Sequence, residues 1–154
     1  MDRLTRNVQD WHTLDNAEAN RLVETATVAR LIGHDHSGPT ISIVRIVAVG
    51  HRIYFYVDGR SFLGRSSVDS SVVLEIDDIS PAQARYSVIV VHGTAHRVGT
   101  VRRDVPQYLL PRPATAEPPL YRLIEVTPTS FSGYSERSGS DVTNSDAGES
   151  SPSN

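Results

Sequence analysis

The fold is decided by residues 40–57, which read TISIVRIVAVGHRIYFYV. β-Branched and aromatic residues fill two runs of this stretch, 40–49 and 53–57, and such residues fit the pleated surface of a strand. Between the runs, Val49-Gly-His-Arg52 contains a glycine, which supplies the backbone freedom of a tight turn. The stretch therefore predicts two antiparallel strands joined by a short turn.

The same pattern continues on both sides of this stretch. Upstream, an apolar run at 28–32 is followed by His34-Asp-His-Ser-Gly-Pro39, whose Asp, Ser, Gly and Pro predict a hairpin turn. Downstream, we expect strands over Val72–Ile76, Tyr86–Val98 and Leu120–Pro128, with a turn-rich insert over Asp77–Arg85. About five or six closely spaced strands with one or two short helices favour a mainly β (α+β) fold, a small antiparallel barrel, over a βαβ sheet.

One helix is predicted before the strands. Apolar residues recur at helical spacing between Leu14 and Arg30, and Asp15 stands three residues before Glu18. This spacing is typical of a helix N-cap with its capping-box partner. Residues 25–28 are rich in β-branched side chains, so we expect the chain to leave the helix there and enter a strand.

Two later segments are predicted to lack regular structure. Five prolines between Val105 and Pro119 block regular hydrogen bonding and predict an extended loop. From Ser135 to Asn154 the chain is almost entirely polar, so burial cannot offset the entropy of ordering it. We therefore expect one domain over residues 1–134 and a disordered tail over 135–154.

The composition excludes several classes of function. A length of 154 residues fits one domain, and a net charge of -3 with mixed charges offers no basic face for nucleic acid. The absence of cysteine excludes disulfides, thiolate metal sites and a cysteine nucleophile. No apolar run approaches the roughly 20 residues of a membrane span, and the first residues lack a signal-peptide core. We expect a cytoplasmic protein that binds neither nucleic acid nor membrane.

Three polar motifs could carry chemistry. His92 and His96 lie four apart, but on a strand this places them roughly 13 Å apart, which favours solvent-facing histidines over a metal site. His34 and His36 lack a third ligand, so no metal is predicted there either. Asp58-Gly-Arg-Ser-Phe-Leu-Gly-Arg65 combines glycines, hydroxyls and arginines after a strand, which suits either a phosphate or carboxylate site or a solvated turn.

A set of stretches carries a family resemblance between Leu14 and Gly133. They are Ala29-Arg-Leu-Ile32, Gly38-Pro-Thr-Ile41, Ile53-Tyr-Phe-Tyr56, Val73-Leu-Glu-Ile-Asp77, Tyr86-Ser-Val-Ile-Val-Val-His-Gly-Thr-Ala95, Tyr121-Arg-Leu-Ile124 and Phe131-Ser-Gly133. In this order they resemble the FMN-binding split barrels of the pyridoxamine 5'-phosphate oxidase superfamily. The resemblance implies an antiparallel split β-barrel that forms a homodimer, with flavin sites at the subunit interface.

The resemblance also implies a set of cofactor-binding residues for FMN or a deazaflavin. The strand at Ile43–Ile46, with Val44, Arg45 and Ile46, would lie along the isoalloxazine ring. The phosphate end would be surrounded by Tyr56, Val57, Arg60 and Ser61, with Arg65 nearby. No catalytic residue is implied.

Departures from the family pattern leave two functions open. Val57 stands where a Thr hydroxyl usually meets the phosphate, Phe62 where a Lys usually follows, and Tyr86 where a Trp is usual. Losing the hydroxyl and the ammonium would weaken flavin binding by roughly a hundredfold or more. The chain is then either a flavin-dependent oxidoreductase acting on a small molecule, or a non-catalytic dimeric binding module without tightly bound flavin.

Overall fold

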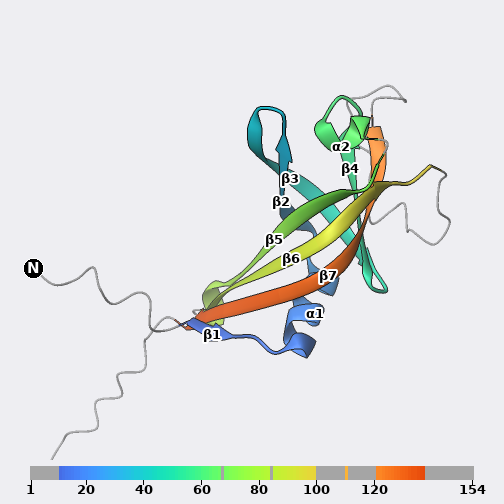
Figure 1. The fold of residues 1–154 in the computed structure, drawn as a ribbon. Helices are drawn as coiled ribbons and strands as arrows, with labels where there is room; N and C mark the ends of the chain where they lie inside the picture. Colours follow the sequence, from blue (N-terminus) through green and yellow to red (C-terminus); the bar gives the residue numbers. More distant parts are fainter. Residues whose placement is uncertain (1–10, 67, 84, 100–109, 111–120, 138–154) are drawn as a thin grey trace, which may run out of the picture.

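This computed structural model describes residues 11–66, 68–83, 85–99, 110 and 121–137 (Figure 1). The described elements, in chain order, are β1 (Trp11–Thr13), α1 (Asn16–Thr25), β2 (Val28–Asp35), β3 (Gly38–Val49), β4 (Arg52–Asp58), α2 (Phe62–Arg65), β5 (Ser70–Ser80), the 3-10 turn η1 (Pro81–Gln83), β6 (Arg85–Arg97) and β7 (Tyr121–Arg137). Antiparallel strands dominate, so the predicted mainly β fold is confirmed. Neither described helix is long and apolar enough to cross a membrane.

The strands form one antiparallel sheet that closes on itself. Its order is β1-β7-β4-β3-β2-β5-β6, and an additional pairing of β6 with β7 completes the barrel. The long strand β7 changes its partner along its length on one side. Residues 121–126 pair with β4, whereas residues 134–136 pair with β1. The lower parts of β5, β6 and β7 extend beyond the barrel as a long ribbon (Figure 1).

Both short turns predicted around β3 are confirmed. The β2–β3 hairpin turns at His36-Ser37, with Gly38 at a φ of +123°, and the β3–β4 hairpin turns at Gly50, with a φ of +62°. Residues with a side chain rarely adopt these positive φ values, so glycine is required at both positions.

Alternation along the strands builds the core. On the inward faces, Leu31, Leu74, Ile89 and Phe55 are at most 7% exposed, and they meet at the centre of the barrel. A second cluster, called here the outer cluster, lies on the outward face of β3, β4 and β7 and contains Val47, Tyr54, Leu110 and Leu123. Strands β4 and β7 are therefore covered on both faces.

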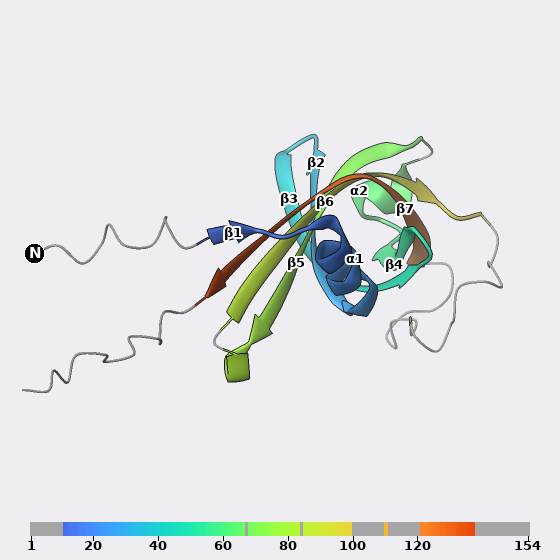
Figure 2. The same cartoon turned by 90° about the horizontal axis from the view of Figure 1, so that it is seen from below.

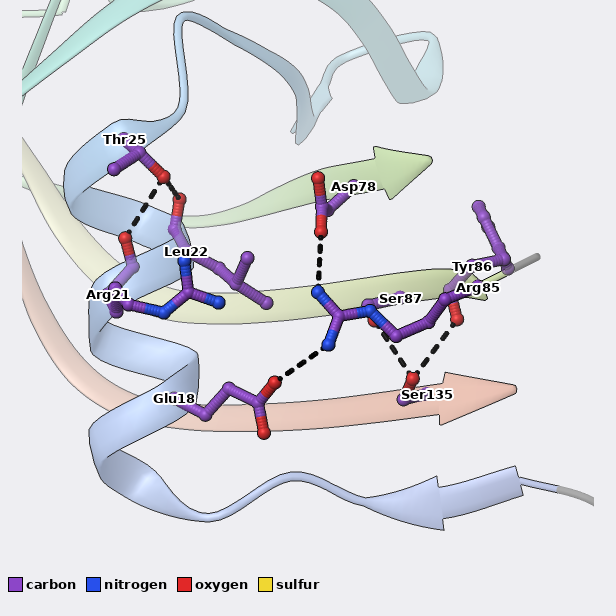
Figure 3. Close-up of polar contacts among 9 residues, drawn as sticks. All are labelled: Glu18, Arg21, Leu22, Thr25, Asp78, Arg85, Tyr86, Ser87 and Ser135. Atoms are coloured by element: carbon purple, nitrogen blue, oxygen red, sulfur yellow. Dashed lines mark hydrogen bonds and ion pairs between the residues drawn. The ribbon is translucent and has the colours of Figure 1, made fainter. Parts of the chain in front are cut away.

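Helix α1 packs against the curled sheet, as Figure 2 shows. Its predicted N-cap is confirmed, because the Asp15 carboxylate accepts a hydrogen bond from the Glu18 amide at 2.8 Å. The Glu18 carboxylate itself accepts from Arg85 on β6 at 3.1 Å, and Arg85 also reaches Asp78 on β5 at 3.4 Å (Figure 3). Arg85 thus ties the helix to two strands.

Two predicted boundaries are wrong. The expected turn-rich insert at 77–85 is mostly strand: β5 runs to Ser80 and β6 starts at Arg85, since outward polar residues continue the alternation. The last strand was expected to end at Pro128 and disorder to begin at 135, but β7 continues to Arg137. Ser135 is 7% exposed and accepts a hydrogen bond from the Ser87 hydroxyl at 3.0 Å (Figure 3).

Strand β1 and helix α2 were not predicted, because each is too short to show a period. Most of the proline-rich loop predicted at 105–119 lies outside the described residues, of which it contributes only Leu110. The rest of the predicted tail, residues 138–154, lies outside them as well.

Candidate functional site

A pocket of about 210 Å³ lies between the β2–β3 hairpin, the end of β4 and helix α2. These elements stand at the same end of the molecule in Figure 1. Apolar side chains form much of its wall: Leu31, Val44, Val57, Phe62 and Leu63. Such a wall suits the face of a flat, largely apolar ring.

Polar groups converge on the same pocket. Thr40 and Ser42 line it from β3, and Tyr56, Asp58 and Ser61 line it from β4 and the turn that follows it. Among the described residues, the Thr40 and Ser42 hydroxyls have no hydrogen-bond partner in the protein. They are therefore available to a ligand.

The turn between β4 and α2 is held tightly by its own backbone. The Ser61 hydroxyl donates to the Asp58 carbonyl at 2.6 Å and accepts from the Gly64 amide at 3.1 Å, so it serves as the N-cap of α2. A Cβ at Gly64 would lie 2.2 Å from the Asp58 carbonyl oxygen. Only glycine therefore allows this close approach of α2 to the end of β4.

An ion pair stands at the edge of the pocket. The Arg60 guanidinium donates to both carboxylate oxygens of Asp58, from Nε at 3.2 Å and from Nη2 at 3.1 Å, and the Arg60 amide donates to the same carboxylate at 2.7 Å. The hydrogen bond from the Arg60 side chain is the main cause that holds the pKa of Asp58 below its ordinary value. Asp58 is thus an ionised hydrogen-bond acceptor at neutral pH.

The structure brings some of the predicted site residues together and separates others. Val44, Tyr56, Val57 and Ser61 all line the pocket. Ile46 is 2% exposed in the barrel core, and Arg45 lies between these two inward residues on the opposite, exposed face of β3. Arg60 and Arg65 are exposed and do not line the pocket.

Leu31, Gly33, Thr40 and Ser42 were missed as pocket residues. Strand alternation could have found two of them, because Thr40 and Ser42 precede Val44 by four and two residues and so share its face. Leu31 could not be found in this way, because it reaches the pocket through pairing with Ser42 on the neighbouring strand.

A second polar cluster lies outside the pocket, beside the outer cluster. The Glu125 carboxylate is 1% exposed and accepts hydrogen bonds from Tyr54 at 2.6 Å and Arg52 at 2.5 Å. The His96 imidazole contacts it at 2.8 Å through Nε2. His96 thus contacts both Glu125 and solvent, since its side chain is 37% exposed, and His92 is exposed. No group of three His, Asp or Glu among the described residues could hold a metal ion.

Fold and pocket define the class: an antiparallel split barrel with a pocket at one end, between a hairpin and a one-turn helix. The chain belongs to the pyridoxamine 5'-phosphate oxidase family, whose model matches residues 15–135. The predicted family is thereby confirmed. No curated protein sequence matches the chain.

Solved structures share this fold. The FAD binding protein from Mycobacterium smegmatis matches with a TM-score of 0.65 at 21% identity, over 83% of this chain and 100% of that one. An FAD-binding protein from Mesorhizobium loti matches with a TM-score of 0.64 at 15% identity, over 81% of this chain and 97% of that one. At these identities the likeness establishes the fold alone.

Proposed function

We propose that this chain is a flavin-binding protein that holds the cofactor in the pocket between the β2–β3 hairpin and α2, and that it oxidises or reduces a small molecule. The observation that carries the proposal is the pocket itself, which joins apolar walls to free hydroxyls in a barrel of the pyridoxamine 5'-phosphate oxidase family. Two proteins of the same fold are named as FAD-binding, which supports the proposal.

The residues of the pocket fit the uncharged part of a flavin. Leu31, Val44 and Phe62 offer apolar surface to a ring, and Thr40 and Ser42 offer hydroxyls to its polar edge or side chain. A bound flavin supplies the hydride chemistry, whereas the protein positions it and limits access of water. Tyr56 and Asp58 are the titratable groups among the described pocket residues, and Asp58 stays ionised at neutral pH.

We also propose that two copies of the chain assemble into a dimer. On the outward face of β3, next to the pocket, Ile43 is 79% exposed and Ile41 is 68% exposed, an apolar surface that a second copy would cover. Light scattering at micromolar concentration is expected to give twice the chain mass of 16.9 kDa; the chain mass itself would contradict the dimer.

The absorption spectrum of the purified full chain tests flavin binding. We expect the visible and near-ultraviolet bands of an oxidised flavin, either as isolated or after addition of riboflavin, FMN, FAD or a deazaflavin. Bleaching of these bands by a chemical reductant and their return with a small-molecule acceptor would support the oxidoreductase function.

The competing function is a non-catalytic dimeric binding module. The observation that favours it is that Val57 and Phe62, which replace the hydroxyl and ammonium usual in the family, both line the pocket. A colourless protein that binds none of the added flavins would favour this module over the flavoprotein.

A further inference from the structure

We infer that the pocket takes the uncharged part of a flavin, its ring and hydroxyl-bearing side chain, and gives no added affinity to a terminal phosphate. Riboflavin is then bound at least as tightly as FMN or FAD. This inference rests on the proposed flavin-binding function and goes beyond it, because it specifies the chemical class of the ligand.

The first argument is the supply of positive charge. A phosphate monoester carries a charge of about -1.5 to -2 at neutral pH, and burying it without a cation is costly. The sequence contains no lysine, so an arginine or histidine would have to meet the phosphate. No arginine or histidine is among the described residues that line the pocket.

The second argument is that the nearest arginine is already engaged. Arg60 makes a two-pronged contact with Asp58, and its side chain is 76% exposed, so it points to solvent rather than into the pocket. A phosphate drawn to the remaining N–H donors of Arg60 would also approach the Asp58 carboxylate, whose negative charge offsets the attraction. The pair is electrically neutral as it stands.

The third argument is the polarity of the remaining groups. A phosphate needs donors, yet the Ser61 hydroxyl already donates to the Asp58 carbonyl, and the ionised Asp58 carboxylate can only accept. The ribityl chain of riboflavin carries hydroxyls that can donate to a carboxylate. Asp58, with the free hydroxyls of Thr40 and Ser42, therefore matches an uncharged, hydroxyl-bearing ligand.

The test compares dissociation constants of riboflavin, FMN and FAD for the flavin-free full chain, measured by quenching of flavin fluorescence. We expect FMN and FAD to bind no more tightly than riboflavin. Tighter binding of either phosphate-bearing flavin would overturn this inference and leave the flavin-binding function standing. Failure of all three to bind would overturn both.

Variants of the ion pair sharpen the test. Asp58→Asn keeps an oxygen for the Arg60 amide but removes the charge, so the unpaired Arg60 should strengthen FMN relative to riboflavin by about tenfold. Arg60→Gln should shift the ratio in the opposite direction. Glu24→Gln makes the same charge change as Asp58→Asn at an exposed position on α1, away from the pocket, and should leave the ratio unchanged (Figure 1). An unchanged ratio in Asp58→Asn would overturn the role given to the pair.

Discussion

Two arginine–carboxylate pairs in this barrel differ in the burial of the carboxylate and in the number of residues that donate to it. Glu125 with Arg52 lies on the outward face of β4 and β7, and the Glu125 side chain is 1% exposed. Asp58 with Arg60 lies at the pocket edge, and the Asp58 side chain is 43% exposed. Glu125 receives donors from three different residues, whereas Asp58 is held by Arg60 alone among the contacts described above.

The difference shows that burial determines how much an ion pair contributes to the stability of the fold. A buried carboxylate whose donors come from separate strands fixes the strands relative to each other, and removing it leaves those donors unpaired. An exposed pair formed within one turn contributes little to stability, because water replaces each partner at small cost. The first pair should therefore support the fold, and the second should tune ligand affinity in the proposed flavin pocket.

The largest effect is expected from removing the buried carboxylate. Glu125→Ala should lower the free energy of unfolding by about 3–5 kcal/mol, since Tyr54, Arg52 and His96 all lose their shared acceptor. Urea unfolding followed by circular dichroism measures the change. Glu125→Gln, which keeps an acceptor oxygen, should lose less. A loss below about 1 kcal/mol in the alanine variant would break the contrast drawn between the two pairs.

A smaller loss is expected from removing one donor to Glu125. Tyr54→Phe should cost about 1.5–3 kcal/mol, the range for a hydrogen bond to a charged group, because Tyr54 is 2% exposed and water does not replace its hydroxyl. Tyr86→Phe is the matched control: its hydroxyl donates to Asp77 at 2.7 Å, but the ring is half-buried and Arg30 also holds Asp77. Equal losses in the two variants would show that burial is not the deciding factor.

The backbone that carries Asp58 is tested by Gly64→Ala. Its Cβ would meet the Asp58 carbonyl oxygen at 2.2 Å, so the turn must shift, at a cost of about 1–3 kcal/mol. Gly99→Ala is the control, because no atom lies within 4 Å of its added Cβ, and it should be neutral. Flavin binding should weaken in Gly64→Ala together with stability. If stability does not change, α2 does not pack as tightly on β4 as the turn geometry requires.

The sequence predicts the fold better than the site, for a physical reason. The β2–β3 and β3–β4 hairpins are encoded locally by turn residues and alternation, and both were predicted correctly. The pocket is lined by residues of β2, β3 and α2, which only the folded structure brings together. No local sequence pattern predicts this arrangement, so Leu31 was missed. Arg45 was placed near the ring by resemblance, although alternation with Val44 puts it on the opposite face.

The Glu125 cluster was missed for a related reason. The strand that carries Glu125 was predicted, but a glutamate on an outward face is ordinarily solvated. Its burial depends on pairing with Tyr54 on β4 and His96 on β6, and on the outer cluster that includes Leu110, about fifteen residues away in sequence. None of these partners is close in the sequence, so only the folded structure brings them together.

The smallest effect on stability is expected at the exposed pair, where the readout is protonation. Arg60→Ala should leave the midpoint of urea unfolding at neutral pH nearly unchanged, since both side chains are in contact with water. It should, however, raise the pKa of Asp58 toward its ordinary value of 3.8, because Arg60 is the main cause of the lowered value. A carboxylate with a lowered pKa in the folded state contributes stability above its unfolded pKa and loses it as the pH falls through the folded pKa. Any small difference in stability between wild type and Arg60→Ala should therefore vanish in strongly acidic solution.

Carbon NMR titration of the Asp58 carboxyl measures the pKa directly. An unchanged value in the variant would mean that Arg60 does not hold Asp58, and the contrast between the two ion pairs would then rest on Glu125 alone.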